Sequence, residues 1–250
     1  MKVGYAQYWI MHPESCILYT MCGRFIQISD PEKIRASLID LELDAAELPE
    51  FSARYNIAPT QNILTVLNTP VPRLTLTHWG LIPFWAKDRT IGNKMINARA
   101  ETLLLKPSFK TSLHKRRCII LSDGFYEWKG SGKGKEPFFI RLKTRVPFGF
   151  AGLWDKWQDR QTGHDILSST IITIDANAVL AEVHSRMPVI LNPDHYKIWL
   201  SDKDVPDSTL MHCLKPYSAQ ELEIYRISTL VNNPGNDSVE CIRPIKNIVT

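Results

Sequence analysis

Cys22 directly follows Met21, and this pair sets the clearest chemistry in the sequence. If the chain starts at Met21 and that Met is removed, Cys22 carries an α-amine beside its own thiol. The amine titrates near ~8 and the thiol near ~8.5, so both are partly nucleophilic at neutral pH. Such a pair can capture an aldehyde as an imine and close it to a five-membered thiazolidine, because ring closure within one residue is strongly favoured. A Cys22 whose nitrogen is an amide cannot react in this way.

The twenty residues before Met21 decide which form exists. They hold one basic residue, Lys2, and several polar interruptions, so they make a poor signal peptide. A misassigned start codon, a segment removed by proteolysis and a retained tail are the three explanations, and we favour the first. We therefore expect residues 1–21 to be an extension and residues 22–250 to be one domain.

Glu127 and His184 are candidates for proton transfer. Glu127 lies between Tyr126 and Trp128, and an apolar pocket there would raise its pKa. The alternative, preferred on this segment alone, is an exposed Glu in a hairpin whose aromatic neighbours pack the core. For His184 the alternatives are a capping or core histidine and, with Arg186 close by, a buried or phosphate-facing cluster.

Asn97 and Arg99 could hold a carbonyl or amine and a phosphate, respectively. The alternative is an N-capping Asn97 beside a surface pair of Arg99 and Glu101.

Basic residues gather in two runs, which singly are typical of solvated faces. Together with interleaved aromatic residues they equally favour a groove for single-stranded nucleic acid, in which cations hold the backbone and rings stack on bases. The runs are Lys106, Lys110, Lys115, Arg116 and Arg117, and Lys129, Lys133 and Lys135; the aromatic residues are Trp79, Phe84, Trp85 and Trp128.

Composition excludes several classes of protein. The chain has 250 residues, 44% of them hydrophobic, and a net charge of only +4, which does not by itself indicate nucleic acid. Its five cysteines are widely spaced without a CxxC pair, which argues against a zinc site or a disulfide framework and suits a reducing compartment. Apolar runs fall short of the ~18 residues of a membrane span.

Short strands dominate the expected secondary structure. Asp30 and Pro31 predict a helix start, and the apolar spacing carries that helix to about Leu41. Further helices are expected at 176–183 and after Asn192. Strands are expected at 63–67, 74–79, 118–121, 137–142, 148–154 and 169–174. Strands and helices do not alternate regularly, so the pattern predicts a single α+β domain.

Six segments, in order along the chain, resemble the SRAP family, which is named for SOS response-associated peptidases and includes proteins that crosslink to abasic sites in DNA. They are residues 21–25 (MCGRF), 54–59 (RYNIAP), 79–83 (WGLIP), 97–102 (NARAET), 123–128 (DGFYEW) and 184–188 (HSRMP). The resemblance implies a single α+β domain of strongly bent, mainly antiparallel sheets with peripheral helices.

The resemblance also implies site residues. Cys22 would form the thiazolidine, Asn97 would position the sugar or the amine, Glu127 would act as acid and base, and His184 would assist sugar opening. The residues implied to hold DNA are Arg24, Arg99 and Arg186 at phosphates, and Asn56, Phe84 and Trp85 at flanking bases.

The implied function is a covalent DNA–protein crosslink that protects abasic sites in the DNA damage response, with weak lyase activity through the imine. The expected partner is single-stranded DNA with an abasic site, or a junction of single and double strands. We expect a monomer without metal or organic cofactor, away from membranes; if the chain is bacterial, we expect it in the cytoplasm, with the nucleoid when bound to DNA. The alternatives are an autoprocessing cysteine peptidase and a non-catalytic reader of single-stranded or modified DNA.

Overall fold

The computed structural model describes residues 22–43 and 49–245, so the expected extension at 1–21 lies outside the described residues. The described chain forms the α-helices α1 (Pro31–Ser37), α2 (Pro107–Lys115), α3 (Tyr196–Trp199) and α4 (Asp207–Cys213). Its strands are β1 (Phe25–Gln27), β2 (Arg54–Ile57), β3 (Asn62–Leu67), β4 (Arg73–Trp79), β5 (Asn97–Arg99), β6 (Arg117–Ser122), β7 (Gly124–Lys129), β8 (Glu136–Leu142), β9 (Phe148–Gln158), β10 (Asp165–Asp175), β11 (Arg186–Pro188) and β12 (Leu222–Arg226). Short 3₁₀ turns, among them η2 (Arg89–Lys94) and η5 (Leu180–Glu182), join them.

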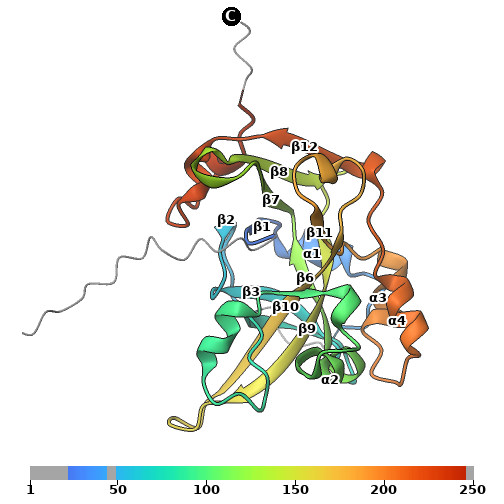
Figure 1. Cartoon of the computed structure of the whole chain (residues 1–250). Coiled ribbons are helices and arrows are strands. Elements are labelled where there is room, and N and C mark those ends of the chain that lie inside the picture. The colour runs from blue at the N-terminus through green and yellow to red at the C-terminus, as the bar shows by residue number, and fades with distance from the viewer. Residues whose placement is uncertain (1–21, 44–48, 246–250) are drawn as a thin grey trace, which may run out of the picture.

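A small barrel forms the lower half of the molecule in Figure 1. Strands β10, β4, β3, β6 and β9 are hydrogen-bonded neighbours in that order, and β9 pairs again with β10, which closes the ring. Within the ring only the described pair β10–β4 is parallel. The predicted α+β fold with mainly antiparallel sheets is therefore confirmed.

β10 is long enough to hold further strands beyond the ring. On one edge it pairs with β4 and then with β5; on the other it pairs with β9 and then with β11. The register sets Thr173 opposite Arg99 on β5, and Asp175 opposite Arg186 on β11. One end of β10 thus holds two of the sequence-predicted segments, one on each of its edges.

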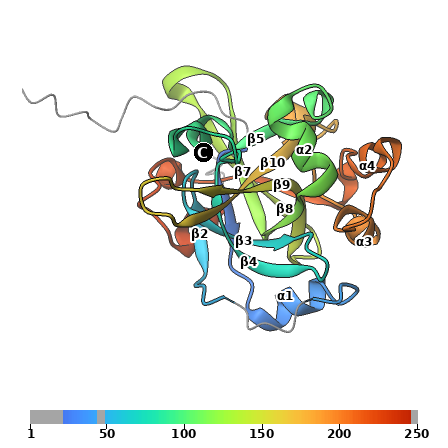
Figure 2. The same cartoon turned by 90° about the horizontal axis from the view of Figure 1, so that it is seen from below.

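A second, antiparallel sheet lies above the barrel in the order β12-β8-β7-β1-β2 (Figure 1). β1 faces the barrel through Phe25, whose ring meets Trp79 at 4.9 Å and Phe150 at 5.9 Å between centroids. Cys22 belongs to the same buried cluster. Packing between the sheet and the barrel therefore fixes the chain just after Cys22. Helices α1 to α4 lie around the outside (Figure 2).

Local signals explain where the helices begin. The Asp30 side chain accepts a hydrogen bond from the Lys33 N–H, and Pro31 occupies the first helical position, as predicted. The helix ends at Ser37 rather than near Leu41. The helix expected at 176–183 is wrong in extent, because Asn177 Oδ1 caps the Leu180 N–H and only the 3₁₀ turn η5 follows.

The predicted strands are found where the sequence placed them. The hairpin of β3 and β4, separated by a turn that includes residues 68–70, is confirmed. β9 and β10 extend beyond their expected ends, because each pairs with the other along most of its length.

Candidate functional site

Cys22 stands directly before β1 and is completely buried. Its φ is +42°, in the left-handed region that residues with a side chain seldom adopt. Its backbone N–H donates a hydrogen bond of 2.6 Å to Glu127 Oε1. The pairing of Phe25 with Phe125 joins β1 to β7 and brings these residues, more than a hundred positions apart, into contact.

Glu127 lies on β7 with only 2% of its surface exposed. Burial raises the pKa of its carboxyl to about 8, although the N–H groups of Cys22 and Trp128 and the charge of Lys135 act in the opposite direction. The alternative of an exposed hairpin glutamate is therefore wrong. A carboxyl with this pKa is close to half-protonated just above neutral pH, and can both donate and accept a proton.

The Cys22 thiol is held in its neutral form. Burial, reinforced by the charge of Glu127, raises the pKa of this thiol well above its ordinary value. The sulfur therefore gives up its proton only in the course of a reaction.

His184 is half-buried between η5 and β11. The Arg186 N–H lies 3.1 Å and the Arg186 carbonyl oxygen 3.3 Å from its Nδ1; where Nδ1 accepts from the N–H, Nε2 carries the proton of the neutral ring. Burial lowers its pKa, with a further lowering from Lys135 and Arg186, while a hydrogen bond to the Arg186 backbone acts in the opposite direction. His184 is thus a neutral hydrogen-bond donor at neutral pH.

Lys135 is a residue whose role sequence reasoning missed. It stands just after the 3₁₀ turn Gly132–Gly134 in the loop from β7 to β8, and its charge lowers the pKa of both Glu127 and His184. In the sequence it was one of three lysines in a glycine-rich run. Its effect on the pKa of both Glu127 and His184 distinguishes it from the other lysines of that run.

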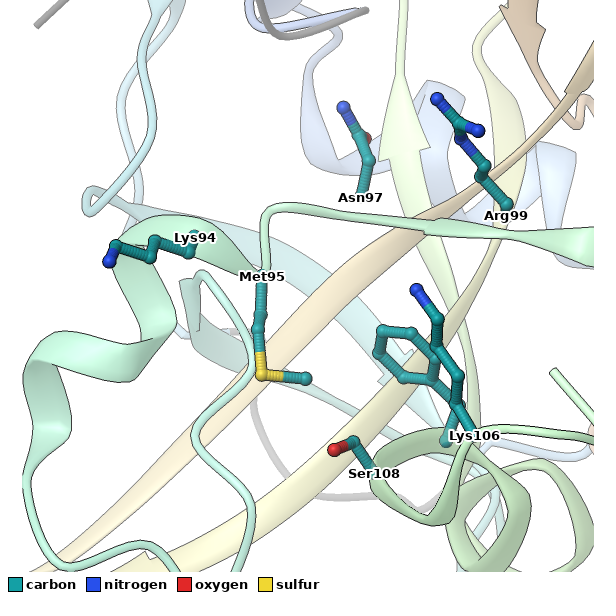
Figure 3. Close-up of a pocket in the computed structure, with 7 residues that line it drawn as sticks. Lys94, Met95, Asn97, Arg99, Lys106 and Ser108 are labelled. Carbon is teal, nitrogen blue, oxygen red and sulfur yellow. The ribbon is translucent and has the colours of Figure 1, made fainter. Parts of the chain in front are cut away.

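Asn97 lies on β5, paired with Ile171 of β10. The alternative of an N-capping Asn97 is therefore wrong. Figure 3 shows that Asn97 and Arg99 extend in the same direction from β5. The same alternative paired Arg99 with Glu101 at the surface, but both Glu101 carboxylate oxygens accept hydrogen bonds from Arg186 instead.

Arg186 is held by protein groups. Its guanidinium binds Glu101 in a fork, Asp175 Oδ1 at 2.6 Å and the Thr173 carbonyl, and 11% of its side chain is exposed. A phosphate at this residue would have to replace a carboxylate, or join the two already bound.

Asn56 is completely buried. Its Oδ1 accepts from Arg24 at 2.7 Å, and its Nδ2 donates to the carbonyls of Val231, Asn233 and Asn236. Arg24 itself also donates to the Val231 carbonyl. A side chain without exposed surface does not reach a base, so in this conformation Asn56 positions Arg24 and the segment after β12.

Phe84 and Trp85 are 55% and 48% exposed, unusual for such large rings. The Phe84 N–H donates to Asp155 Oδ2 at 2.9 Å, and the Arg116 guanidinium lies 5.6 Å from the centre of its ring. The segment is thus anchored through its backbone while both rings face solvent.

The basic runs do not form one groove as a whole. Arg117 is completely buried and donates to backbone carbonyls, and Arg116 pairs with Asp155. Trp79 is also completely buried, with its indole N–H on the Ile96 carbonyl. These three residues belong to the protein interior or to an ion pair, which corrects the groove hypothesis for them.

A cavity of about 320 Å³ opens beside Asn97 and Arg99 (Figure 3). Lys94, Met95, Lys106, Ser108 and Phe109 complete its lining. It carries positive charge from three residues.

Within residues 22–43 and 49–245, no group of three or more His, Cys, Asp or Glu side chains is placed to hold a metal ion. In the same ranges, Cys22, Cys118, Cys213 and Cys241 are free. None of the described helices has the length and apolar character to cross a membrane.

The chain belongs to the SRAP family: the family model described as "SOS response associated peptidase (SRAP)" matches residues 21–234. This confirms the resemblance drawn from the six segments.

Its relatives include abasic site processing protein YoaM of Bacillus subtilis (strain 168), 45% identical over 225 residues that cover 89% of this chain and 97% of that protein. Abasic site processing protein YedK of Escherichia coli (strain K12) is 32% identical over 232 residues, covering 90% and 100%. A crystal structure of a protein from Bacteroides thetaiotaomicron, 26% identical, superposes with a TM-score of 0.78 over 90% of this chain and 100% of that one.

Proposed function

We propose that this protein processes abasic sites in single-stranded DNA, or at junctions of single and double strands, by forming a covalent thiazolidine at Cys22. The hydrogen bond of 2.6 Å between the Cys22 nitrogen and Glu127 Oε1 carries the proposal. When Cys22 is the first residue, the same nitrogen is an α-amine with a buried acid–base group in contact. The names of the curated relatives support abasic DNA as the substrate.

The reaction begins with attack of the Cys22 amine on the C1′ aldehyde of the opened sugar. The C–N bond forms and the carbonyl oxygen becomes a hydroxyl with one proton of the amine. That hydroxyl leaves as water with a proton from Glu127, and Glu127 regains a proton when the nitrogen gives up its second one. The resulting imine accepts the Cys22 sulfur at the same carbon, and the thiol proton ends on the ring nitrogen. One water is lost overall, so the step needs neither metal nor organic cofactor, and one protomer suffices.

The neighbouring residues have separate parts in this proposal. Asn97 positions the sugar or the amine. His184 donates from Nε2 to the furanose oxygen as the sugar opens, since that oxygen becomes a hydroxyl. Arg24, Arg99 and Arg186 hold phosphates, with Asn56 acting through Arg24, while Phe84 and Trp85 stack on flanking bases. The imine also permits β-elimination, which gives weak lyase activity.

The Cys22→Ser variant tests the order of attack. Protein that begins at residue 22 is incubated with abasic single-stranded DNA and run on a denaturing gel, with and without borohydride. We expect a stable adduct from wild type and, from Cys22→Ser, a species seen only after borohydride traps the imine. If the variant binds DNA but yields no trapped species, the amine is not the nucleophile. If correctly processed wild type also yields no adduct, the protein is a non-covalent reader.

A second candidate function, autoprocessing, is favoured by the same hydrogen bond together with the backbone of Cys22. The Cys22 nitrogen is also the leaving group of the Met21–Cys22 peptide bond, and a left-handed residue costs roughly 1–2 kcal/mol that cleavage would release. In this reaction the thiol adds to the Met21 carbonyl carbon, Glu127 protonates the departing nitrogen, and water hydrolyses the thioester.

Intact mass measured over time on the purified 250-residue protein tests autoprocessing. We expect a fragment of residues 22–250 to accumulate, and Cys22→Ala and Glu127→Gln to remain uncut. A folded wild-type protein that keeps its full mass would remove the peptidase reaction and leave the crosslinking proposal untouched.

A further inference from the structure

The cavity beside Asn97 has a distinct charge pattern. Its cations come from separate elements: Lys94 ends η2, Arg99 ends β5 and Lys106 precedes α2. None of the described residues that line it carries a carboxylate. In Figure 3 the Lys106 side chain rises from the start of α2 towards β5, whereas Lys94 extends away from Asn97 and Arg99. Lys106 is therefore the lysine of the cavity that is directed towards the strand of Asn97 and Arg99.

The acidic residue nearest to Arg99 in sequence does not neutralise its charge. Glu101 follows Arg99 by two residues, and its pKa is lowered chiefly by the hydrogen bonds from Arg186, with a smaller effect from Arg99. Because both of its oxygens accept from Arg186, Glu101 is committed to that residue. Arg99 is exposed at the cavity.

We propose that this cavity is a phosphate subsite in which Lys106, with Ser108 as a further donor, acts beside Arg99 on the phosphate next to the abasic sugar. A guanidinium, an ammonium and a hydroxyl line the same cavity, and each is a donor suited to phosphate oxygens. Asn97 and Arg99 lie two residues apart on one strand, ~7 Å. The sugar at Asn97 and the phosphate at Arg99 are then neighbouring groups of the same DNA strand.

This inference rests on the proposed function for the identity of the strand, but its test does not depend on covalent chemistry. The probe is single-stranded DNA with a reduced abasic analogue, which lacks the aldehyde and cannot form an imine. Failure of crosslinking with intact binding would count against the thiazolidine alone. Failure of the subsite would leave crosslinking in place.

Lys106→Met and Lys110→Met form a matched pair for the test. Lys110 is exposed on the same helix and does not line the cavity. Single linkages of the probe are replaced in turn by neutral methylphosphonate, and affinity is measured against salt concentration. We expect wild type and Lys110→Met to lose affinity at one linkage beside the analogue. Lys106→Met should be insensitive there, and its slope of log affinity against log salt should be smaller by ~0.7.

Two further arms complete the experiment. Lys106→Arg should restore the sensitivity, because it keeps a cation that can bind phosphate. A probe that ends at the analogue, with either a terminal phosphate or a hydroxyl, distinguishes a terminal monoester from an internal diester as the source. Lys106-dependent discrimination in either probe supports the subsite. Identical linkage profiles and salt slopes for Lys106→Met and wild type would overturn it.

Discussion

At the scale of single residues, Glu127 is the buried titratable group in contact with the Cys22 nitrogen. The carboxyl shares a hydrogen bond with the Cys22 nitrogen where water is excluded, so its charge is costly and its proton is retained to about pH 8. The same group can therefore serve an amine that must lose a proton and a hydroxyl that must gain one. This double capacity connects the geometry with the proposed chemistry.

Glu127→Gln should change how the unfolding free energy depends on pH. In the unfolded chain a Glu ionises near ~4.3, while folded Glu127 keeps its proton to about pH 8. Between these values the folded state binds the extra proton, so wild-type stability falls as pH rises, by up to ~1.4 kcal/mol per unit. Gln does not titrate. Urea unfolding at several pH values should show that the unfolding free energy of the variant rises relative to that of wild type from pH 5 to 8. A difference between the two free energies that does not change with pH would contradict the buried carboxyl.

His184→Ala should slow adduct formation by something like ~10²–10⁴-fold while DNA affinity is kept, because it removes the donor to the opening sugar. Glu127→Gln should slow capture, in which Glu127 gives its proton to the departing hydroxyl, and should impair reversal more strongly, since reopening the thiazolidine requires a proton on the departing sulfur or nitrogen. Single-turnover capture and competitor-chase assays measure the two directions, with melting curves as the control for folding. Wild-type rates in both directions from folded variants would remove these residues from the mechanism.

The sequence allowed candidate site residues to be chosen by type, but it did not predict the environment of each residue. Cys22, Glu127 and Asn97 could be selected from the sequence because their chemistry and order were informative. The burial of Glu127 could not, because it depends on β7 packing beside β1 and β8, which are paired over long sequence distances. The same limit explains Asn56, whose contacts lie about 175 to 180 positions away.

At the scale of elements, the junction of α2 and β6 turns one basic residue inward. The chain leaves α2 at Lys115 and enters β6 at Arg117, so residues close together in a basic run can have opposite environments. Lys115 is exposed at the end of α2, whereas Arg117 begins β6 with its guanidinium among the carbonyls of Leu113, His114, Trp199 and Ser201. Arg117 thereby joins α2 and α3 to the barrel.

Arg117→Met should destabilise the fold by ~3 kcal/mol or more, because several buried carbonyls lose their donor and each costs ~1–3 kcal/mol. Lys115→Met, the matched surface change, should stay within ~0.5 kcal/mol. Chemical denaturation of both variants measures the difference. Equal midpoints would mean that methionine packing compensates for the lost hydrogen bonds. If Arg117→Met instead unfolds normally but loses DNA affinity, the structural role is wrong.

Short sequence signals predicted where some of the elements begin. Asp30 and Pro31 gave the start of α1, and the turn after Leu67 gave the β3–β4 hairpin. The closure of the barrel was not predictable in this way, because β10 pairs not only with its chain neighbours β9 and β11 but also with β4 and β5, which come from distant parts of the chain. Periodicity within a segment carries no information about such partners.

At the scale of the whole molecule, the upper sheet and the barrel meet where the proposed chemistry begins. Glu127 lies on the upper sheet and Cys22 stands just before its strand β1. Asn97 and Arg99 lie on β5 and Arg186 lies on β11, and both of these strands pair with β10 of the barrel. The core of Phe25, Trp79 and Phe150 holds these two parts together. The proposed site therefore draws on both parts of the molecule and on widely separated segments of the chain.

The central claim is that a free amine on Cys22 makes the crosslink. The direct measurement compares protein beginning at Cys22 with the intact, mass-verified 250-residue form, each incubated with abasic single-stranded DNA and analysed under denaturing conditions. We predict a stable adduct from the first, heavier than the protein by the DNA less one water, and none from the second, whose Cys22 nitrogen is an amide. Equal crosslinking by the intact extended form would contradict the thiazolidine mechanism.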